Sequence, residues 1–133
     1  MKKIKQSLLL AKEDFEVIIS YLKLGLHRNT FSRQEAEGLE SELKRAKLVD
    51  KNELPDDVVR LNSSVTIKDE SEEKVLQVTV VTPEKADIKK LKISIFSPIG
   101  TALIGISKGQ KIAWKVPSGK KIFSVLDVNN SFG

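Results

Sequence analysis

The spacing of apolar residues changes once along this chain, and that change constrains the fold more than any other feature. Before Leu54-Pro55 the apolar residues recur at helical spacing, and after it they alternate as in strands. Pro55 cannot continue a helix and disfavours helical backbone at the residue before it. The pattern therefore predicts an α+β fold with a helical hairpin at residues 1–53 and a sheet domain at residues 54–133.

Two helices are expected in the first part. The first covers Lys12–Leu24, where apolar residues follow the i, i+3, i+4, i+7 spacing, and Gly25 suits its end. The second begins at the capping box Ser32–Glu35. Its apolar residues then step by three and four, at Ala36, Leu39, Leu43 and Ala46. Together they predict a short antiparallel coiled coil that projects about 20–24 Å.

The first helix carries a second apolar row that the partner helix cannot cover, formed by Val17, Tyr21 and Leu24. Two interpretations stay open for this row. It packs against the following domain, or it forms a surface for a partner or for self-association.

The second part predicts an antiparallel sheet with one short helix. The β-rich runs are Val65–Ile67, Val75–Val81, Lys92–Phe96, Lys111–Val116 and Lys121–Val128. Ser97-Pro98 provides an N-cap and a first-turn proline for a helix that Gly105 ends. Trp114 shares a strand face with Ile112 and Val116 and is interpreted as core.

Several classes of catalytic site are excluded. Cysteine is absent and His27 is the single histidine, so thiolate sites and paired-histidine metal sites cannot form. No phosphate loop, dinucleotide fingerprint or nucleophile elbow occurs. The acidic pairs lie in polar turn regions and are expected to be solvated, at Asp56/Asp57, Asp69/Glu70 and Glu72/Glu73. We therefore expect no catalytic residue, no metal and no cofactor.

The first apolar run does not predict export or membrane insertion. Charged residues from Lys12 to Glu16 interrupt it, and no stretch of about 18 uncharged apolar residues follows. The expected location is the cytoplasm.

The net charge of +5 is concentrated in the second half of the chain. Between residues 85 and 121 the only acid is Asp87, whereas lysines are frequent. The candidate basic patch is Lys85, Lys89, Lys90, Lys92, Lys120 and Lys121. Such a patch attracts anions, and weak nucleic-acid or DNA binding is one interpretation; a solvated lysine-rich face is the other. Arginine and regularly spaced aromatic residues for base stacking are missing there.

Three motifs in order, Ala86-Asp87-Ile88, Ser97 to Gly105 and Pro117-Ser118-Gly119, resemble the GreA/GreB transcript-cleavage-factor family. The similarity follows the C-terminal domain of that family almost end to end. It implies an FKBP-like domain that docks on RNA polymerase near its secondary channel. The residues that match the docking loop are Ser97, Pro98, Ile99 and Thr101.

The expected hairpin bend departs from that family. The resemblance implies a long coiled coil with an acidic tip that helps polymerase hold a second magnesium ion. Here the bend includes His27, Arg28 and Asn29 and has no carboxylate, so a cation would be repelled. The chain is more similar to the short-hairpin, Rnk-like members. We therefore expect a monomeric, non-enzymatic polymerase-binding regulator; the alternatives are a nucleic-acid-binding module or a cleavage factor with an atypical tip.

Overall fold

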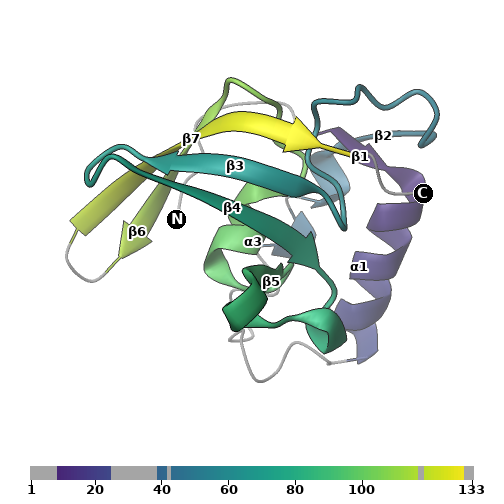
Figure 1. Ribbon diagram of the computed structural model, residues 1–133. Coiled ribbons are helices and arrows are strands. Elements are labelled where there is room, and N and C mark those ends of the chain that lie inside the picture. Colours follow the sequence, from purple (N-terminus) through teal and green to yellow (C-terminus); the bar gives the residue numbers. More distant parts are fainter. Residues whose placement is uncertain (1–8, 25–38, 42, 117–118, 131–133) are drawn as a thin grey trace.

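A five-stranded sheet in the order β5-β4-β3-β7-β6 lies at the centre of the structure (Figure 1). The structure is a computed structural model and describes residues 9–24, 39–41, 43–116 and 119–130. The sheet strands are β3 (Ser64–Asp69), β4 (Lys74–Val81), β5 (Lys92–Ser94), β6 (Lys111–Val116) and β7 (Gly119–Asn129). Each of the five predicted strands is therefore present; β6 has the predicted ends, and each of the other four is shifted at one or both ends.

The middle strand β3 shows why the alternating pattern was informative. Val65 and Ile67 are fully buried, whereas Thr66 and Lys68 between them are partly exposed. β3 pairs antiparallel with β4 on one side and with β7 on the other, and β7 continues antiparallel to β6. One face of the sheet therefore lies against the core.

The expectation of an entirely antiparallel sheet is wrong at β5. This strand runs parallel to β4, with Lys92 opposite Thr79. The connection returns the chain to the same end through two 3₁₀ helices, η1 (Pro83–Lys85) and η2 (Ile88–Lys90). Leu91 then adopts a left-handed φ of 56° that redirects the chain into β5.

The short helix α3 (Pro98–Leu103) follows β5 as the sequence predicts. Ser97 is its N-cap, and the glycine beyond its end, Gly105, has a φ of 80°. The predicted strand Lys92–Phe96 is shorter, because Ile95 and Phe96 form a buried turn into α3. The side chains of Trp114 and Val116, predicted to be core, lie outside the described part.

In the N-terminal part, α1 covers Lys12–Leu24, the range that the sequence predicted. Residues 39–41 and 43–45 are also helical. The capping box Ser32–Glu35 and the expected bend lie outside the described residues, so the hairpin stays a prediction. Two strands were not predicted, β1 (Leu9–Ala11) and β2 (Lys47–Val49), which pair in parallel. Three residues are too few to show a period.

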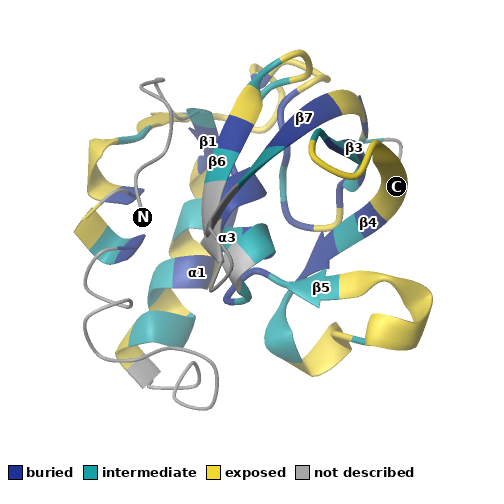
Figure 2. Cartoon of the chain, turned by 90° about the vertical axis from the view of Figure 1, so that its left-hand side faces the viewer, coloured by how far each residue is buried: buried dark blue, intermediate teal, exposed yellow. Residues whose placement is uncertain are grey.

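The N-terminal elements share the core of the sheet. Ile18 of α1 and Leu39 and Leu43 of the second helical segment belong to the same buried cluster as Ile67 and Phe96. Figure 1 shows α1 near the arrowhead ends of β4 and β7, and Figure 2 shows buried positions on α1 and on the sheet. The described part of the N-terminal region therefore shares a hydrophobic core with the sheet instead of projecting away from it. The division at residue 54 stays a prediction.

The residues of the second apolar row of α1 do not all follow the same interpretation, because one packs against the rest of the chain and another is exposed. Tyr21 packs against Phe96 with ring centroids 6.1 Å apart, and its hydroxyl donates to Glu84 at 2.6 Å. Tyr21 thus contacts the part of the chain that follows Pro55. Val17 remains 38% exposed, and the side chain of Leu24 lies outside the described part. Within that part, no helix is long and apolar enough to cross a membrane.

Candidate functional site

The predicted docking residues lie in one tightly bonded turn between β5 and α3. The Ser97 hydroxyl donates to the Ser94 carbonyl oxygen at 2.7 Å and accepts from the Gly100 amide at 3.1 Å. The Thr101 hydroxyl donates to the carbonyl oxygen of Ile95 at 2.8 Å. These bonds fix the start of α3 against the end of β5, so the turn is held as a rigid surface feature.

Gly100 allows this turn to close. A β-carbon at this position would lie 2.1 Å from the Ser94 carbonyl oxygen, closer than any real contact of that kind. Only glycine lets the first turn of α3 approach the end of β5 this closely. Ile99 and Thr101, on either side of it, are partly exposed and available to a partner. The side chain of Pro98 lies outside the described part.

The polar groups of the turn bond to one another. The hydroxyl of Ser97 is already both a donor and an acceptor within the turn, and no general base contacts it in the described structure. Within residues 9–24, 39–41, 43–116 and 119–130, no group of three histidine, cysteine or acidic residues could hold a metal ion. The residues of the expected hairpin tip, His27, Arg28 and Asn29, lie outside that part.

The candidate basic patch is separated into two groups. Lys85, Lys89, Lys90 and Lys92 lie around η1, η2 and β5 at one edge of the sheet. Lys121 lies on β7, toward the opposite end of the strands and roughly 25 Å away along them. It pairs with Asp69 at 3.1 Å and Glu72 at 2.8 Å. The side chain of Lys120 lies outside the described part, so the described lysines do not form one continuous patch.

The expectation that Asp69 is a solvated, ordinary acid is wrong. Asp69 is buried at the β3–β4 turn and accepts from the amide and hydroxyl of Ser71 and from Lys121. These bonds, with the Ser71 hydroxyl first, lower the pKa of Asp69 to about 2. Glu70 accepts from the Ser124 hydroxyl, which lowers its pKa as well. Both carboxylates therefore stabilise the turn as anions.

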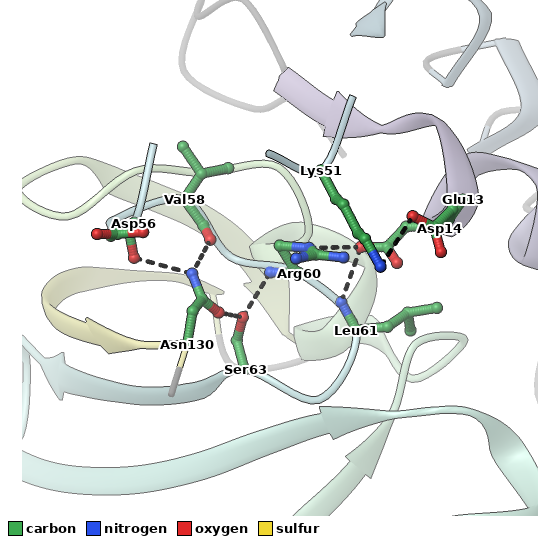
Figure 3. Close-up of polar contacts among 9 residues, drawn as sticks. All are labelled: Glu13, Asp14, Lys51, Asp56, Val58, Arg60, Leu61, Ser63 and Asn130. Carbon is green, nitrogen blue, oxygen red and sulfur yellow. Dashed lines mark hydrogen bonds and ion pairs between the residues drawn. The ribbon is translucent and has the colours of Figure 1, made fainter. Parts of the chain in front are cut away.

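Sequence reasoning missed a buried polar contact that joins α1 to the sheet domain (Figure 3). Asp14 of α1 accepts from the Arg60 side chain at 3.4 Å and from the Leu61 amide at 3.2 Å. Burial raises the pKa of Asp14, and the charge of Arg60 opposes that shift. The available signal was an arginine inside the apolar segment Val58–Leu61, where a buried cation requires an acidic partner.

A second polar contact lies beside the first. Asn130 donates to the carbonyl oxygens of Asp56 at 2.8 Å and Val58 at 2.9 Å, and accepts from the Ser63 hydroxyl (Figure 3). Ser63 in turn accepts from the Arg60 amide at 2.7 Å. The end of β7 is thereby fixed to the segment that receives Asp14.

Comparison with known proteins identifies the family. The family model described as "Transcription elongation factor, GreA/GreB, C-term" matches residues 54–130, which include the whole sheet and the Ser97–Thr101 turn. The chain belongs to the GreA/GreB family. The resemblance inferred from the sequence motifs is confirmed at this level.

Individual members of the GreA/GreB family agree. Transcription elongation factor GreA of Clostridium botulinum is 38% identical over 90 residues, which are 68% of this chain and 56% of that protein. The GreA of Rhodospirillum rubrum is 37% identical over 98 residues, which are 74% of this chain and 62% of that protein. The matched segments thus span little more than half the length of these relatives.

A solved structure extends the similarity to the fold. The structure described as a prokaryotic transcription elongation factor GreA/GreB from Nitrosomonas europaea has a TM-score of 0.76 and 33% sequence identity. The similarity covers 95% of this chain and 100% of that one. The arrangement of helices and strands is therefore shared with a GreA/GreB protein over nearly the whole chain.

Proposed function

We propose that this protein is a monomeric, non-enzymatic regulator that binds RNA polymerase near the secondary channel and does not stimulate transcript cleavage. The observation that carries the proposal is the family match over residues 54–130, which contains the turn that the resemblance assigns to docking. The similar GreA proteins are named transcription elongation factors, which favours the same partner.

The geometry of the docking turn supports a role in contact with a protein. Ser97 and Gly100 hold the turn rigid, so Ile99 and Thr101 lose little conformational freedom when a partner covers them. A pre-ordered surface of this kind binds with a smaller entropic cost than a loop that must first be ordered.

The absence of cleavage stimulation is proposed from the sequence of the expected hairpin bend. Residues 26–31 contain no aspartate or glutamate, whereas a magnesium ion requires oxygen ligands such as carboxylates. Arg28 adds a positive charge that opposes a cation. We further propose that the N-terminal part forms a short antiparallel hairpin, that the sheet domain is FKBP-like and that the protein is of the Rnk-like subtype. The short helix α3 beside the sheet is compatible with that domain.

A binding assay with core RNA polymerase tests the proposed partner. The purified protein should elute with core polymerase in gel filtration, and a full-length GreA should displace it. Replacing the partly exposed Ile99 by alanine should weaken binding about tenfold, as expected for a central apolar contact.

The matched control is Leu126→Ala, which shortens another apolar side chain, 42% exposed on β7, away from the turn. It should leave the affinity unchanged. Circular dichroism of both variants checks that they are folded. Equal loss in the two variants, or no binding by the unmodified protein, would contradict the proposed docking surface.

A further inference from the structure

β4 extends beyond the strand that covers its outer edge. β5 pairs only with Thr79–Val81, so the first part of β4 has no neighbour on that side in the described structure (Figure 1). The Thr79 amide donates to the Leu91 carbonyl oxygen at 2.9 Å, toward β5. Because backbone groups alternate along a strand, those of Val75 and Gln77 point to the same side. The described residues offer them no strand partner.

This open edge is apolar. Val75 is 55% exposed and Leu76 39% exposed, on the two faces of the strand. At the end of the edge, Ile88 is 74% exposed and Leu91 38% exposed. An edge strand with unpaired backbone groups and exposed apolar side chains is a template for pairing with another chain.

Four lysines border the same edge, and none of them forms an ion pair within the described structure. They are Lys85, Lys89, Lys90 and Lys92. The acids nearest in sequence accept hydrogen bonds from other groups. Asp87 accepts from the amide of Lys89, and Glu84 accepts from the hydroxyls of Tyr21 and Thr82. The bonds to Glu84, with the Thr82 hydroxyl first, lower its pKa, and the charge of Lys85 adds to that lowering. Figure 2 shows this segment next to β5 as largely exposed. The edge is therefore apolar, and its end near Thr79 is positively charged, whereas the exposed Glu73 precedes its other end.

We propose that the open edge of β4, from Lys74 to Gln77, binds an extended acidic segment of a partner protein as an added strand. The backbone groups of Val75 and Gln77 bond to that segment, and its acidic side chains pair with the lysines around η2 and β5. A second copy of this chain would bring like charges together, which disfavours self-pairing. Nucleic acid is disfavoured because the edge carries aliphatic side chains and lacks arginine and aromatic residues.

Synthetic peptides test this inference independently of RNA polymerase. The probe is a peptide of about ten residues, a usual upper length for a strand, that alternates valine with glutamate. The matched control peptide alternates valine with lysine. Amide hydrogen exchange of the isotope-labelled protein is followed by NMR at the edge. The acidic peptide should slow exchange at Val75 and Gln77 by about tenfold. Exchange at Leu76 and Val78, whose amides face β3, should change little.

Two variants separate the backbone and charge contributions. Gln77→Pro removes an amide that faces away from β3, a position where an edge strand tolerates proline. Lys90→Glu reverses one of the bordering charges, and Lys47→Glu on β2 makes the same change outside the five-stranded sheet. Gln77→Pro and Lys90→Glu should each weaken binding of the acidic peptide about tenfold, and Lys47→Glu should leave this binding unchanged.

The wild-type experiment decides the inference even if a variant does not fold. Slower exchange at Val75 and Gln77 with the acidic peptide alone supports it. Equal effects of the two peptides, no effect at millimolar concentration, or protection on another face would overturn it. So would protection by a single-stranded oligonucleotide in place of the peptide, or protection that rises with protein concentration alone.

Discussion

Gly100 lies where the first turn of α3 meets the end of β5, and its missing side chain is a packing requirement. Gly100→Ala would place a β-carbon 2.1 Å from the Ser94 carbonyl oxygen, so the backbone must shift. We expect a loss of about 2–3 kcal/mol in the free energy of unfolding, measured by urea denaturation. Gly109→Ala is the matched comparison, because it has a φ of 89° but no neighbouring atom within 4 Å. Its loss should be smaller, about 1 kcal/mol; equal losses would contradict the steric explanation.

Asp69 gives a prediction on pH. Its pKa falls from 3.8 to about 2 in the folded protein, so the folded state binds the proton less readily than the unfolded state. The stability from Asp69 is therefore complete above pH 3.8 and is lost as the pH falls toward about 2. Asp69→Asn removes this contribution.

Urea unfolding of the wild type and Asp69→Asn, repeated at pH values from about 5 to about 2, measures the effect. The difference in stability between the two proteins should shrink as the pH falls. The exposed Asp56→Asn serves as control, since its carboxylate forms no ion pair among the described residues. A difference for Asp69→Asn that stays constant over this range would show that the carboxylate is not held as an anion.

For single residues, roles that depend on neighbours in sequence could be predicted, whereas roles that depend on partners far away in sequence could not. Ser97 caps α3 through the amide of Gly100, three residues along the chain, so the local sequence was sufficient. Asp14 contacts Arg60 and Asp69 contacts Lys121, 46 and 52 residues away. Burial and charge at such positions depend on tertiary packing, which no local pattern contains.

Among the elements, α3 depends most on one side chain. Ser97→Ala removes the hydroxyl that accepts from Gly100 and donates to Ser94, so we expect about 1 kcal/mol less stability. Ser20→Ala is a matched control, because the exposed Ser20 hydroxyl only donates to the Glu16 carbonyl oxygen within α1. Chemical denaturation should show a change near zero for that variant. A similar loss in both would mean that the cap does not stabilise the turn.

The predictability of the elements follows their length. α1 was predicted with its observed ends, because thirteen residues display the helical period fully. β1 and β2, at three residues each, display none, and their pairing joins parts of the chain far apart in sequence. β5 was found, but its parallel direction depends on the left-handed turn at Leu91, which the sequence did not indicate.

For the whole molecule, the shared core predicts one cooperative unfolding transition. Ile18 of α1 is buried in the same cluster as residues of the sheet, so Ile18→Ala should destabilise both by about 2–4 kcal/mol. Far-ultraviolet circular dichroism follows the helices, and fluorescence of Trp114 follows β6. The two urea curves should coincide in the wild type and shift together in the variant. Separate transitions would show that the two parts fold independently.

For the molecule as a whole, the sequence indicated a helical part and a sheet part, but it did not indicate how the two parts pack together. The change of hydrophobic period at Leu54-Pro55 is a local signal, whereas the packing of α1 against the later part of the chain depends on contacts such as Tyr21 with Phe96. Such contacts involve apolar residues that a projecting hairpin would also contain. The sequence therefore favoured a helical hairpin that projects away from the sheet.

Transcript cleavage in backtracked RNA polymerase complexes tests the central proposal most directly. Residues 26–31, the expected hairpin bend, contain no carboxylate that could bind a second magnesium ion, so the protein alone should leave transcript lengths unchanged. Because both proteins are proposed to use the same docking site, adding it in excess should slow the cleavage that a GreA protein stimulates. Shortened transcripts with this protein alone, or undiminished GreA-stimulated cleavage in its presence, would contradict the account.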